Sequence, residues 1–296
     1  MASTKEIQDR MKSIRDTLKI TSAMYMISSA KMKKAKKMLY ETEPFFDTLQ
    51  LEMARIIQLD PKAKGKFYPR TEIKEEDRKA GYVVITGDKG LAGAYNHNIL
   101  KSYEEHLAAH PHHRLYCLGE VGYHYMLEKG YTVDRHLKYV GQNPTLSRAR
   151  LLTEELIGDY LDGTIDELYM VYTRMVNAMT ENVVRFKLLP IEKSKYSVDD
   201  SSDIIHQGLT FDPGPDKFME QIVPVYMTGY LFGAFVEADA CEHNARMMAM
   251  KSSSDNAKEM LSDLEIAYNR ARQGAITQEI TEVVAGANAQ KRQKKS

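Results

Sequence analysis

Cysteine is scarce in this chain, and only Cys117 and Cys241 occur among its 296 residues. The two cysteines lie far apart and fit no metal-binding or redox spacing, which argues against a disulfide framework and indicates a reducing compartment. Proline is absent before Pro44 and after Pro224. Because proline interrupts helices, both ends of the chain are free to form long ones.

Long hydrophobic runs are also missing. The N-terminal sequence MASTKEIQDRMKSIRD contains no apolar segment of the kind that a secretory signal requires. The longest apolar stretch, residues 222–236, is broken by Pro224, Thr228, Gly229 and Gly233 and is too short to cross a bilayer. We therefore expect any association with a membrane to be peripheral and to depend on a partner.

The formal net charge is zero, with 41 basic and 41 acidic residues, but the charges are distributed unevenly. Residues 1–40 contain ten Lys/Arg and three Asp/Glu, a net of +7, whereas residues 41–241 have a net of −9. A basic N-terminal segment therefore precedes an acidic middle. The length suits one or two domains with a hydrophobic core.

The N-terminal segment shows a heptad-like apolar seam with steps of four and three residues. Ser3 and Glu6 have the spacing of a helix N-terminal capping box. A second apolar row, formed by Ile20, Met24 and Ile27, lies beside the seam, and a two-helix rod would leave it partly in water. The seam consists of Ile7, Met11, Ile14, Leu18, Thr21, Tyr25, Ser28, Met32, Ala35 and Leu39.

The C-terminal segment repeats this pattern, and helix is possible from Pro224 to about residue 288. An apolar stripe containing Ile276, Ile280 and Val283 continues beyond the seam. Its seam consists of Met247, Met250, Ser254, Ala257, Leu261, Leu264, Tyr268 and Ala271.

Strand and helix patterns alternate in the middle of the chain, which predicts a small α/β domain. The expected strands are 81–86, 114–119, 132–140, 167–175 and 182–190. The expected helices are 94–109, 120–129 and 145–162. Charged and Pro-rich stretches at 60–80 and 192–216 are interpreted as connections.

The predicted fold class is mixed, with a long antiparallel coiled coil of the terminal helices and an inserted Rossmann-like α/β domain. If one helix enters the domain and the other leaves it, the two must pair in opposite directions. We expect a coiled-coil helix at 1–59, the α/β domain at 60–212 and a second coiled-coil helix with a short basic tail at 213–296. The C-terminal helix is the longer, so its tip is expected to protrude.

A glycine-rich turn, ITGDKGLAGAYN (85–96), follows a strand and opens a helix, which raises the possibility of a nucleotide site. The spacing of Gly87, Gly90 and Gly93 does not fit G-x-G-x-x-G, and no G-K-[ST] follows. A tight strand-to-helix turn is the simpler interpretation, and no nucleotide or other cofactor is expected. His110, His112 and His113 are interpreted as a solvated loop, because no Cys or helically spaced His completes a metal site.

A lysine cluster marks the first helix, at Lys31, Lys33, Lys34, Lys36 and Lys37. It could be a solvated face, a nucleic-acid surface or a surface for an acidic protein partner. The pI near 7 and the lack of interleaved aromatics argue against nucleic acid, and the adjacent apolar row favours a protein. No arrangement of nucleophile, base and acid stands out, so we expect a non-catalytic protein rather than an enzyme.

Four colinear segments resemble the gamma subunit of bacterial-type F-type ATP synthase, the central stalk. They are TLKITSAMYMISSAKMKKAKK (17–37), ITGDKGLAGAYN (85–96), VYTRMVNAMTENVVRFKLLP (171–190), and CEHNARMMAM (241–250) with LEIAYNRARQGAITQEITEVVAGANA (264–289). Ala92, Ala94 and Cys241 stand where the family often has Cys, Gly and Ser. A structural scaffold and a nucleotide-binding enzyme remain as alternatives that explain only one segment each.

The resemblance implies a rotary shaft that turns inside a ring of three alpha and three beta subunits at the cytoplasmic face of the cell membrane. Its α/β domain would contact epsilon and the c-ring, and proton flow would drive the rotation. By position, the beta-contacting residues would be Met24, Lys31, Lys33, Lys34, Lys36, Glu242, Arg246, Arg272, Gln273 and Glu279. The chain itself would bind no small-molecule substrate and no nucleic acid.

Overall fold

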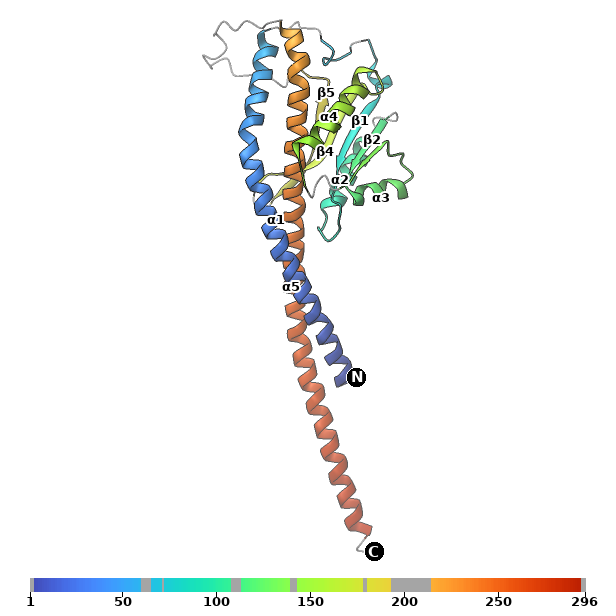
Figure 1. Cartoon of the computed structure of the whole chain (residues 1–296). Coiled ribbons are helices and arrows are strands. Elements are labelled where there is room, and N and C mark those ends of the chain that lie inside the picture. The colour runs from blue at the N-terminus through green and yellow to red at the C-terminus, as the bar shows by residue number, and fades with distance from the viewer. Residues whose placement is uncertain are drawn as a thin grey trace. The chain divides into compact units, whose positions relative to one another are not determined.

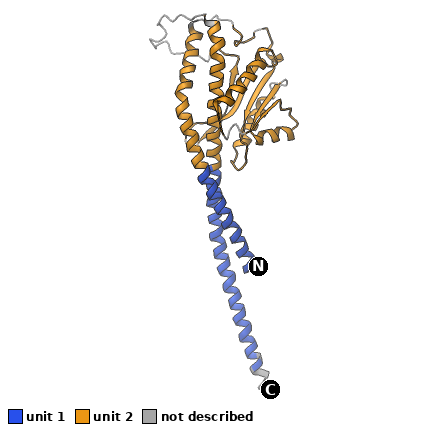
Figure 2. Ribbon diagram, viewed as in Figure 1, with its two compact units in different colours: residues 1–27, 247–296 blue, residues 28–246 orange. Residues whose placement is uncertain are grey.

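A computed structural model describes residues 3–59, 65–70, 72–107, 113–138, 143–177, 180–192 and 214–293. The chain divides into two compact units, residues 1–27 with 247–296 and residues 28–246 (Figure 2). Two long helices, α1 (Thr4–Leu59) and α5 (Pro215–Gln293), each contribute to both units (Figure 1). Among the described residues, no helix combines the length and the apolar character needed to cross a bilayer.

The start of α1 has the predicted cap, since the Glu6 backbone N–H donates to Ser3 Oγ at 3.2 Å. Pro44 lies inside this helix and Pro224 lies inside α5. Each of these prolines is followed four residues later by a threonine whose hydroxyl donates to the proline carbonyl at 2.8 Å, at Thr48 and Thr228. The sequence permitted helix from Pro224 onward, but α5 already begins at Pro215.

The first unit is an antiparallel helix pair. Arg15 Nη2 lies 3.3 Å from Glu265 Oε1, and Ser254 Oγ donates to Thr21 Oγ1 at 2.8 Å. The partner residue number falls as the α1 number rises, which establishes the antiparallel direction. The predicted seam is buried here at Ile7, Met11, Thr21, Met250, Ser254 and Ala257.

The second unit contains a five-stranded sheet of order β3-β2-β1-β4-β5. The strands β1, β2, β3 and β4 are parallel, and β5 runs antiparallel to β4. The strands are β1 (Ala80–Ile85), β2 (His113–Leu118), β3 (Arg135–Leu137), β4 (Glu167–Met175) and β5 (Glu181–Leu189). The shorter helices are a 3-10 turn (Glu75–Asp77), α2 (Tyr95–Leu107), α3 (Glu120–Glu128) and α4 (Leu146–Leu161).

Helices cover both faces of this sheet. One core joins the sheet residues Val83, Ile85 and Met170 to α4, to the first part of α5 and to the last turns of α1. The other joins Tyr82, Val84 and their neighbours to α2, α3 and Cys241 of α5. A parallel sheet whose strands are buried on both faces is typical of α/β domains.

The mixed fold class is confirmed, and every strand and helix predicted within the α/β domain is present to within three residues at each end except one strand. The strand predicted at 132–140 has only three residues in β3, since only Arg135–Leu137 pair with β2. Residues 139 and 140 lie outside the described residues, as do most of the predicted connection at 192–216 and His110 and His112 of the histidine cluster.

Candidate functional site: surfaces of the terminal helices and the glycine-rich turn

The glycine-rich turn begins at the carboxyl end of β1. Successive strands are added on one side of β1 up to β3 and then, from β4, on its other side. Open α/β sheets commonly bind ligands at this place. Here the side chain of Glu242 on α5 stands at the start of the turn, since a Cβ on Gly87 would lie 2.8 Å from the Glu242 carboxylate carbon. The Gly87 N–H is also used, donating to Asn96 Oδ1 at 2.8 Å. A carboxylate in this position opposes phosphate binding.

Arg246 connects α5 to the same turn. Its Nη2 donates to the carbonyl oxygens of Lys89 at 3.1 Å and Gly90 at 3.2 Å, and its Nε donates to Gly90 at 3.3 Å. Arg246 also forms an ion pair with Glu242 one helical turn away. Both side chains are buried, at 7% and 6% exposure. Burial raises the pKa of Glu242, and the charge of Arg246 partly offsets that rise.

The tip of the turn is presented to solvent. Lys89, Gly90 and Leu91 are exposed, and Leu91 adopts a left-handed φ of 62° that non-glycine residues rarely take. Backbone outliers of this kind cluster at functional sites, so the tip of the turn is a candidate contact surface. Leu91 could not be identified from the sequence, because its backbone angle and its exposure depend on the fold.

Two further buried polar residues continue the cluster on α5. His243 Nδ1 lies 3.2 Å from Arg246 Nη1, and His243 Nε2 lies 3.2 Å from Asp239 Oδ1. Asp239 and His243 were not predicted, although their spacing of four residues on one helix could have suggested a pair. A small cavity of about 90 Å³ separates them from Lys31 and Lys34 of α1.

The lysine cluster is mainly exposed. Lys31, Lys33 and Lys34 are exposed and Lys36 is half-buried. Lys37 lies 3.7 Å from Glu41, an exposed ion pair on the same helix. The cluster therefore keeps most of its positive charge available to an acidic surface.

The second apolar row of α1 is largely uncovered. Ile20 is 62% and Ile27 57% exposed, whereas Met24 is half-buried. The prediction that pairing with α5 leaves this row partly in water is therefore confirmed.

The last part of α5 has no helix covering it within the described residues. Every side chain described from Arg272 onward is exposed, including Gln273 and Glu279. Ile276, Ile280 and Val283 are 45%, 59% and 72% exposed. The apolar stripe on this part of α5 is therefore exposed to water in the isolated chain.

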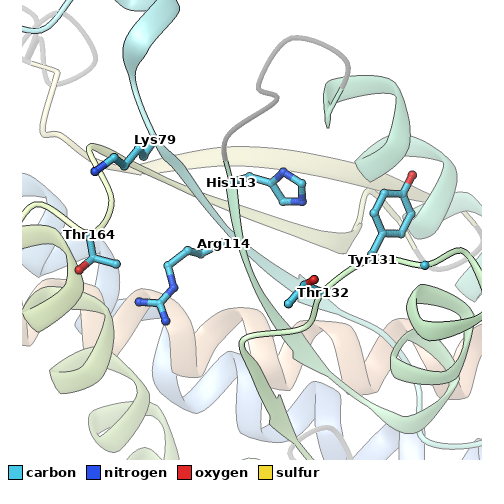
Figure 3. Close-up of a pocket in the computed structure, with 7 residues that line it drawn as sticks. Lys79, His113, Arg114, Tyr131, Thr132 and Thr164 are labelled. Atoms are coloured by element: carbon cyan, nitrogen blue, oxygen red, sulfur yellow. The ribbon is translucent and has the colours of Figure 1, made fainter.

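A basic cavity of about 510 Å³ lies at the amino ends of the parallel strands (Figure 3). Arg114 is already paired there with Asp134 at 2.9 Å and Asp159 at 3.3 Å. Lys79 Nζ lies 3.4 Å from the Gly163 carbonyl, and its side chain extends away from His113 in Figure 3. The basic groups do not converge on a common point, so the cavity does not form an anion site. No group of acidic, histidine or cysteine residues suited to a metal occurs among the described residues.

The terminal helices pair with each other and leave an apolar surface uncovered. The α/β domain has α5 packed against its glycine-rich turn, where a ligand would otherwise bind. These features define a stalk-type subunit of a larger assembly. The family model described as ATP synthase matches residues 3–290. The ATP synthase gamma chain of Acetivibrio thermocellus is 41% identical over 98% of this chain and all of its own length. The chain belongs to the family of ATP synthase gamma chains, the central rotary shaft of that enzyme.

Other relatives agree with this assignment. The gamma chain of Ruminiclostridium cellulolyticum is 41% identical over 96% of this chain and 98% of its own. A sodium-ion-specific gamma chain of Acetobacterium woodii is 32% identical over 97% of this chain and 98% of its own. The fold resembles that of a chain in the mitochondrial ATP synthase of Euglena gracilis, with a TM-score of 0.70, 16% identity, and coverage of 99% of this chain and 96% of that one.

Proposed function

We propose that this chain is the non-catalytic shaft that couples proton-driven rotation of a c-ring to the conformational cycle of three catalytic beta subunits. The observation that carries the proposal is the exposed apolar row at Ile20 and Ile27, beside a seam that the partner helix already covers. Exposed apolar area of this kind is stabilised when a protein sleeve covers it. An alpha3-beta3 ring around the helix pair would supply that sleeve.

Coupling in this proposal arises from differential contact. A two-helix shaft presents a different surface in each direction, so each beta subunit would meet different residues at a given angle. Rotation would then shift each catalytic site among its binding states, because a ligand or partner biases an equilibrium only through unequal contacts. ATP hydrolysis by the same sites would drive the shaft in reverse.

The exposed basic residues would contact acidic surfaces of the beta subunits. Lys31, Lys33 and Lys34 have the exposure that this role requires, and half-buried Lys36 could contribute its ammonium group. Exposed ion pairs contribute only about 0–1 kcal/mol each. Torque would therefore depend on many weak contacts and on the shape of the helix pair.

Arg272, Gln273 and Glu279 would meet the beta subunits on the uncovered part of α5, with Met24 contributing from α1. Arginine suits a directional contact, because its planar guanidinium can donate two parallel hydrogen bonds. Glu242 and Arg246 would act indirectly in our proposal. Both side chains are engaged with the glycine-rich turn, so they would hold Lys89 and Leu91 toward a partner.

The α/β domain would contact an epsilon subunit and the c-ring at the cytoplasmic face of the cell membrane. Similar folds occur in the central stalk and c-ring structure of Tetrahymena thermophila ATP synthase, with a TM-score of 0.60 and 22% identity over 79% of this chain. This likeness supports the fold, and the peripheral position follows in our proposal from the family assignment.

Reconstitution tests the proposal. The chain is mixed with alpha and beta subunits of its own complex, and assembly and ATP hydrolysis are measured with and without it. We expect a stable complex and hydrolysis that depends on the chain. A monomer that remains free in the presence of alpha and beta would contradict the proposal. Ile20→Asp with Ile27→Asp should weaken assembly, whereas Lys258→Asp, at an exposed position of α5, serves as a control for added charge.

A further inference from the structure

A polar cavity of about 230 Å³ lies where α2 approaches β4 and β5, beside Tyr95 at the end of the glycine-rich turn. It is lined by Tyr95, Asn98, Thr173, Glu181, Asn182 and Val183. Asn98 and Asn182 are exposed, so the cavity has access to solvent. Its lining supplies a carboxylate, hydroxyls and amide groups, which are oxygen-rich donors.

The sheet register places the side chains of Thr173 and Glu181 on the same face of the sheet. Thr173 is paired with Val183, and Met175 is paired with Glu181, in the antiparallel β4–β5 ladder. Residues two apart on a strand point to the same face, so Thr173 and Glu181 share the face that α2 covers. The hydroxyl and the carboxylate therefore line one cavity because of the register and not because of a flexible loop.

Three buried oxygens at this place lack hydrogen-bond partners among the described residues. They are Glu181 Oε2, Thr173 Oγ1 and Asn244 Oδ1, the last belonging to a side chain of α5 that hydrogen-bonds to Glu181. Thr173 is only 3% exposed. A buried polar atom without a partner costs about 1–3 kcal/mol, so a bound species that contacts these oxygens would be stabilising.

The charge of Glu181 is also uncompensated. Other buried carboxylates of this unit have cationic partners: Glu167 lies 2.8 Å from Lys187, and Asp166 lies 3.0 Å from Arg70. No Lys, Arg or His lies within ion-pair distance of Glu181 in the part of the chain that the structure describes. Burial raises the pKa of this carboxyl, and the hydrogen bond with Asn244 only partly offsets that rise.

We propose that this cavity binds a monovalent metal cation, sodium or potassium, through Glu181 Oε2 and Thr173 Oγ1. Carboxylate, hydroxyl and amide oxygens are hard donors that suit such ions. A single carboxylate neutralises one positive charge, whereas divalent cations are bound tightly by sites with more carboxylates. The volume leaves room for water molecules, each of which occupies about 30 Å³, to complete the coordination.

The site does not rest on the rotary function. A bound cation would join the end of the β4–β5 hairpin to α2 and, through Asn244, to α5. It would therefore stabilise the folded α/β domain by an amount that rises with the logarithm of one plus the ratio of cation concentration to Kd. The competing possibility is a cavity that holds only water beside a protonated Glu181.

Thermal unfolding of the full chain distinguishes these possibilities. The midpoint is measured in sodium, potassium and choline chloride at equal ionic strength. We expect sodium or potassium to raise the midpoint by about 2–4 °C over choline, with a shift that grows with the logarithm of the cation concentration once the site is filled. The cation with the larger effect identifies the preferred ion. Equal midpoints in the three salts would overturn the proposal in favour of water.

Variants locate the effect. Glu181→Gln and Thr173→Val keep the size of each side chain and should abolish the cation-dependent shift. Glu105→Gln, an exposed position on α2 outside the cavity, should retain it. An unchanged shift in Glu181→Gln would also overturn the proposal.

A second measurement does not require a variant. Carbon NMR of the Glu181 carboxyl in the unaltered chain should show a lower pKa in sodium or potassium than in choline, because a bound cation favours the charged form. An identical pKa in all three salts would exclude the site.

Discussion

A Cβ on Gly87 would stand 2.8 Å from the carboxylate carbon of Glu242, although the two positions lie far apart in the chain. The absence of a side chain at Gly87 thus lets α5 bring a buried carboxylate against the turn after β1. Arg246 then completes the contact by donating to the carbonyls of Lys89 and Gly90. This junction secures α5 to the α/β domain, and substitutions at Gly87, Glu242 and Arg246 test how much it stabilises the fold.

Gly87→Ala should lower the free energy of unfolding by about 1–3 kcal/mol, because an added methyl group forces the carboxylate of Glu242 to move in a packed site. Urea unfolding of the full chain measures the change. Gly90→Ala is the matched control, since no atom lies within 4 Å of a Cβ at that position. Equal stability of the two alanine variants would show that the close approach has no energetic importance.

Arg246→Ala should cost about 3–5 kcal/mol, because it leaves the buried Glu242 without its cation. The double variant that combines Arg246→Met with Glu242→Gln should cost less than Arg246→Ala alone, since it removes both charges together. Measured stabilities of the single and double variants form the test. A double variant less stable than Arg246→Ala would show that the ion pair stabilises the fold beyond offsetting the cost of burying its two charges.

The pH dependence of Arg246→Ala provides an independent check. The folded-state pKa of Glu242 is already raised by burial, and loss of Arg246 raises it further. Between the unfolded and the folded pKa the native state binds more protons, so its stability falls as pH rises through that window. Unfolding of the variant followed from about pH 5 to pH 7 should show this decrease more strongly than the unaltered chain. A stability that increases over this range would contradict the assignment.

Thr21 and Ser254 should be coupled. Ser254 Oγ donates to Thr21 Oγ1 at 2.8 Å inside the helix pair. Thr21→Val leaves the buried Ser254 hydroxyl without this acceptor and should cost about 1–3 kcal/mol. Ser254→Ala should cost less, because the Thr21 hydroxyl still donates to the Leu18 carbonyl at 3.2 Å, and the double variant should cost less than the sum. Circular dichroism during thermal unfolding provides the four values. Strict additivity would mean that the hydroxyls do not interact.

Lys34→Ala alone should leave the assembled complex intact. An exposed lysine contributes about 0–1 kcal/mol to a contact, and its neighbours Lys31 and Lys33 remain. Size-exclusion chromatography of the reconstituted complex measures assembly. Replacing all three lysines should weaken association and reduce its salt dependence. Loss of the complex from the single change would refute contacts spread over many residues.

The sequence predicted those features that depend on periodicity. The buried positions Ile7, Met11 and Thr21, the exposed row at Ile20 and Ile27, and four of the five strands follow from spacing alone. The short β3 could not be predicted, because its length depends on which of its residues pair with β2. The start of α5 before Pro224 depends on packing, which overrides a local helix breaker.

The site was predicted less completely, for a physical reason. Glu242 and Arg246 were identified by resemblance, but their contact with Lys89 and Gly90 depends on how α5 packs against the sheet. Glu181 and Thr173 became a candidate site only when the strand register placed their oxygens on one face. The contacts with beta subunits that the resemblance implies stay predictions.

Rotation of the chain inside its complex tests the central claim most directly. Cys117 and Cys241 are buried, and burial raises the pKa of the Cys117 thiol to about 12, so both should react slowly with thiol reagents. A cysteine introduced by Glu128→Cys, at an exposed end of α3, can then carry a visible probe selectively. With alpha3-beta3 fixed to a surface and ATP supplied, we predict continuous rotation of the probe in one direction, pausing at three positions per turn. ATP hydrolysis by the labelled complex without rotation of the probe would contradict the account.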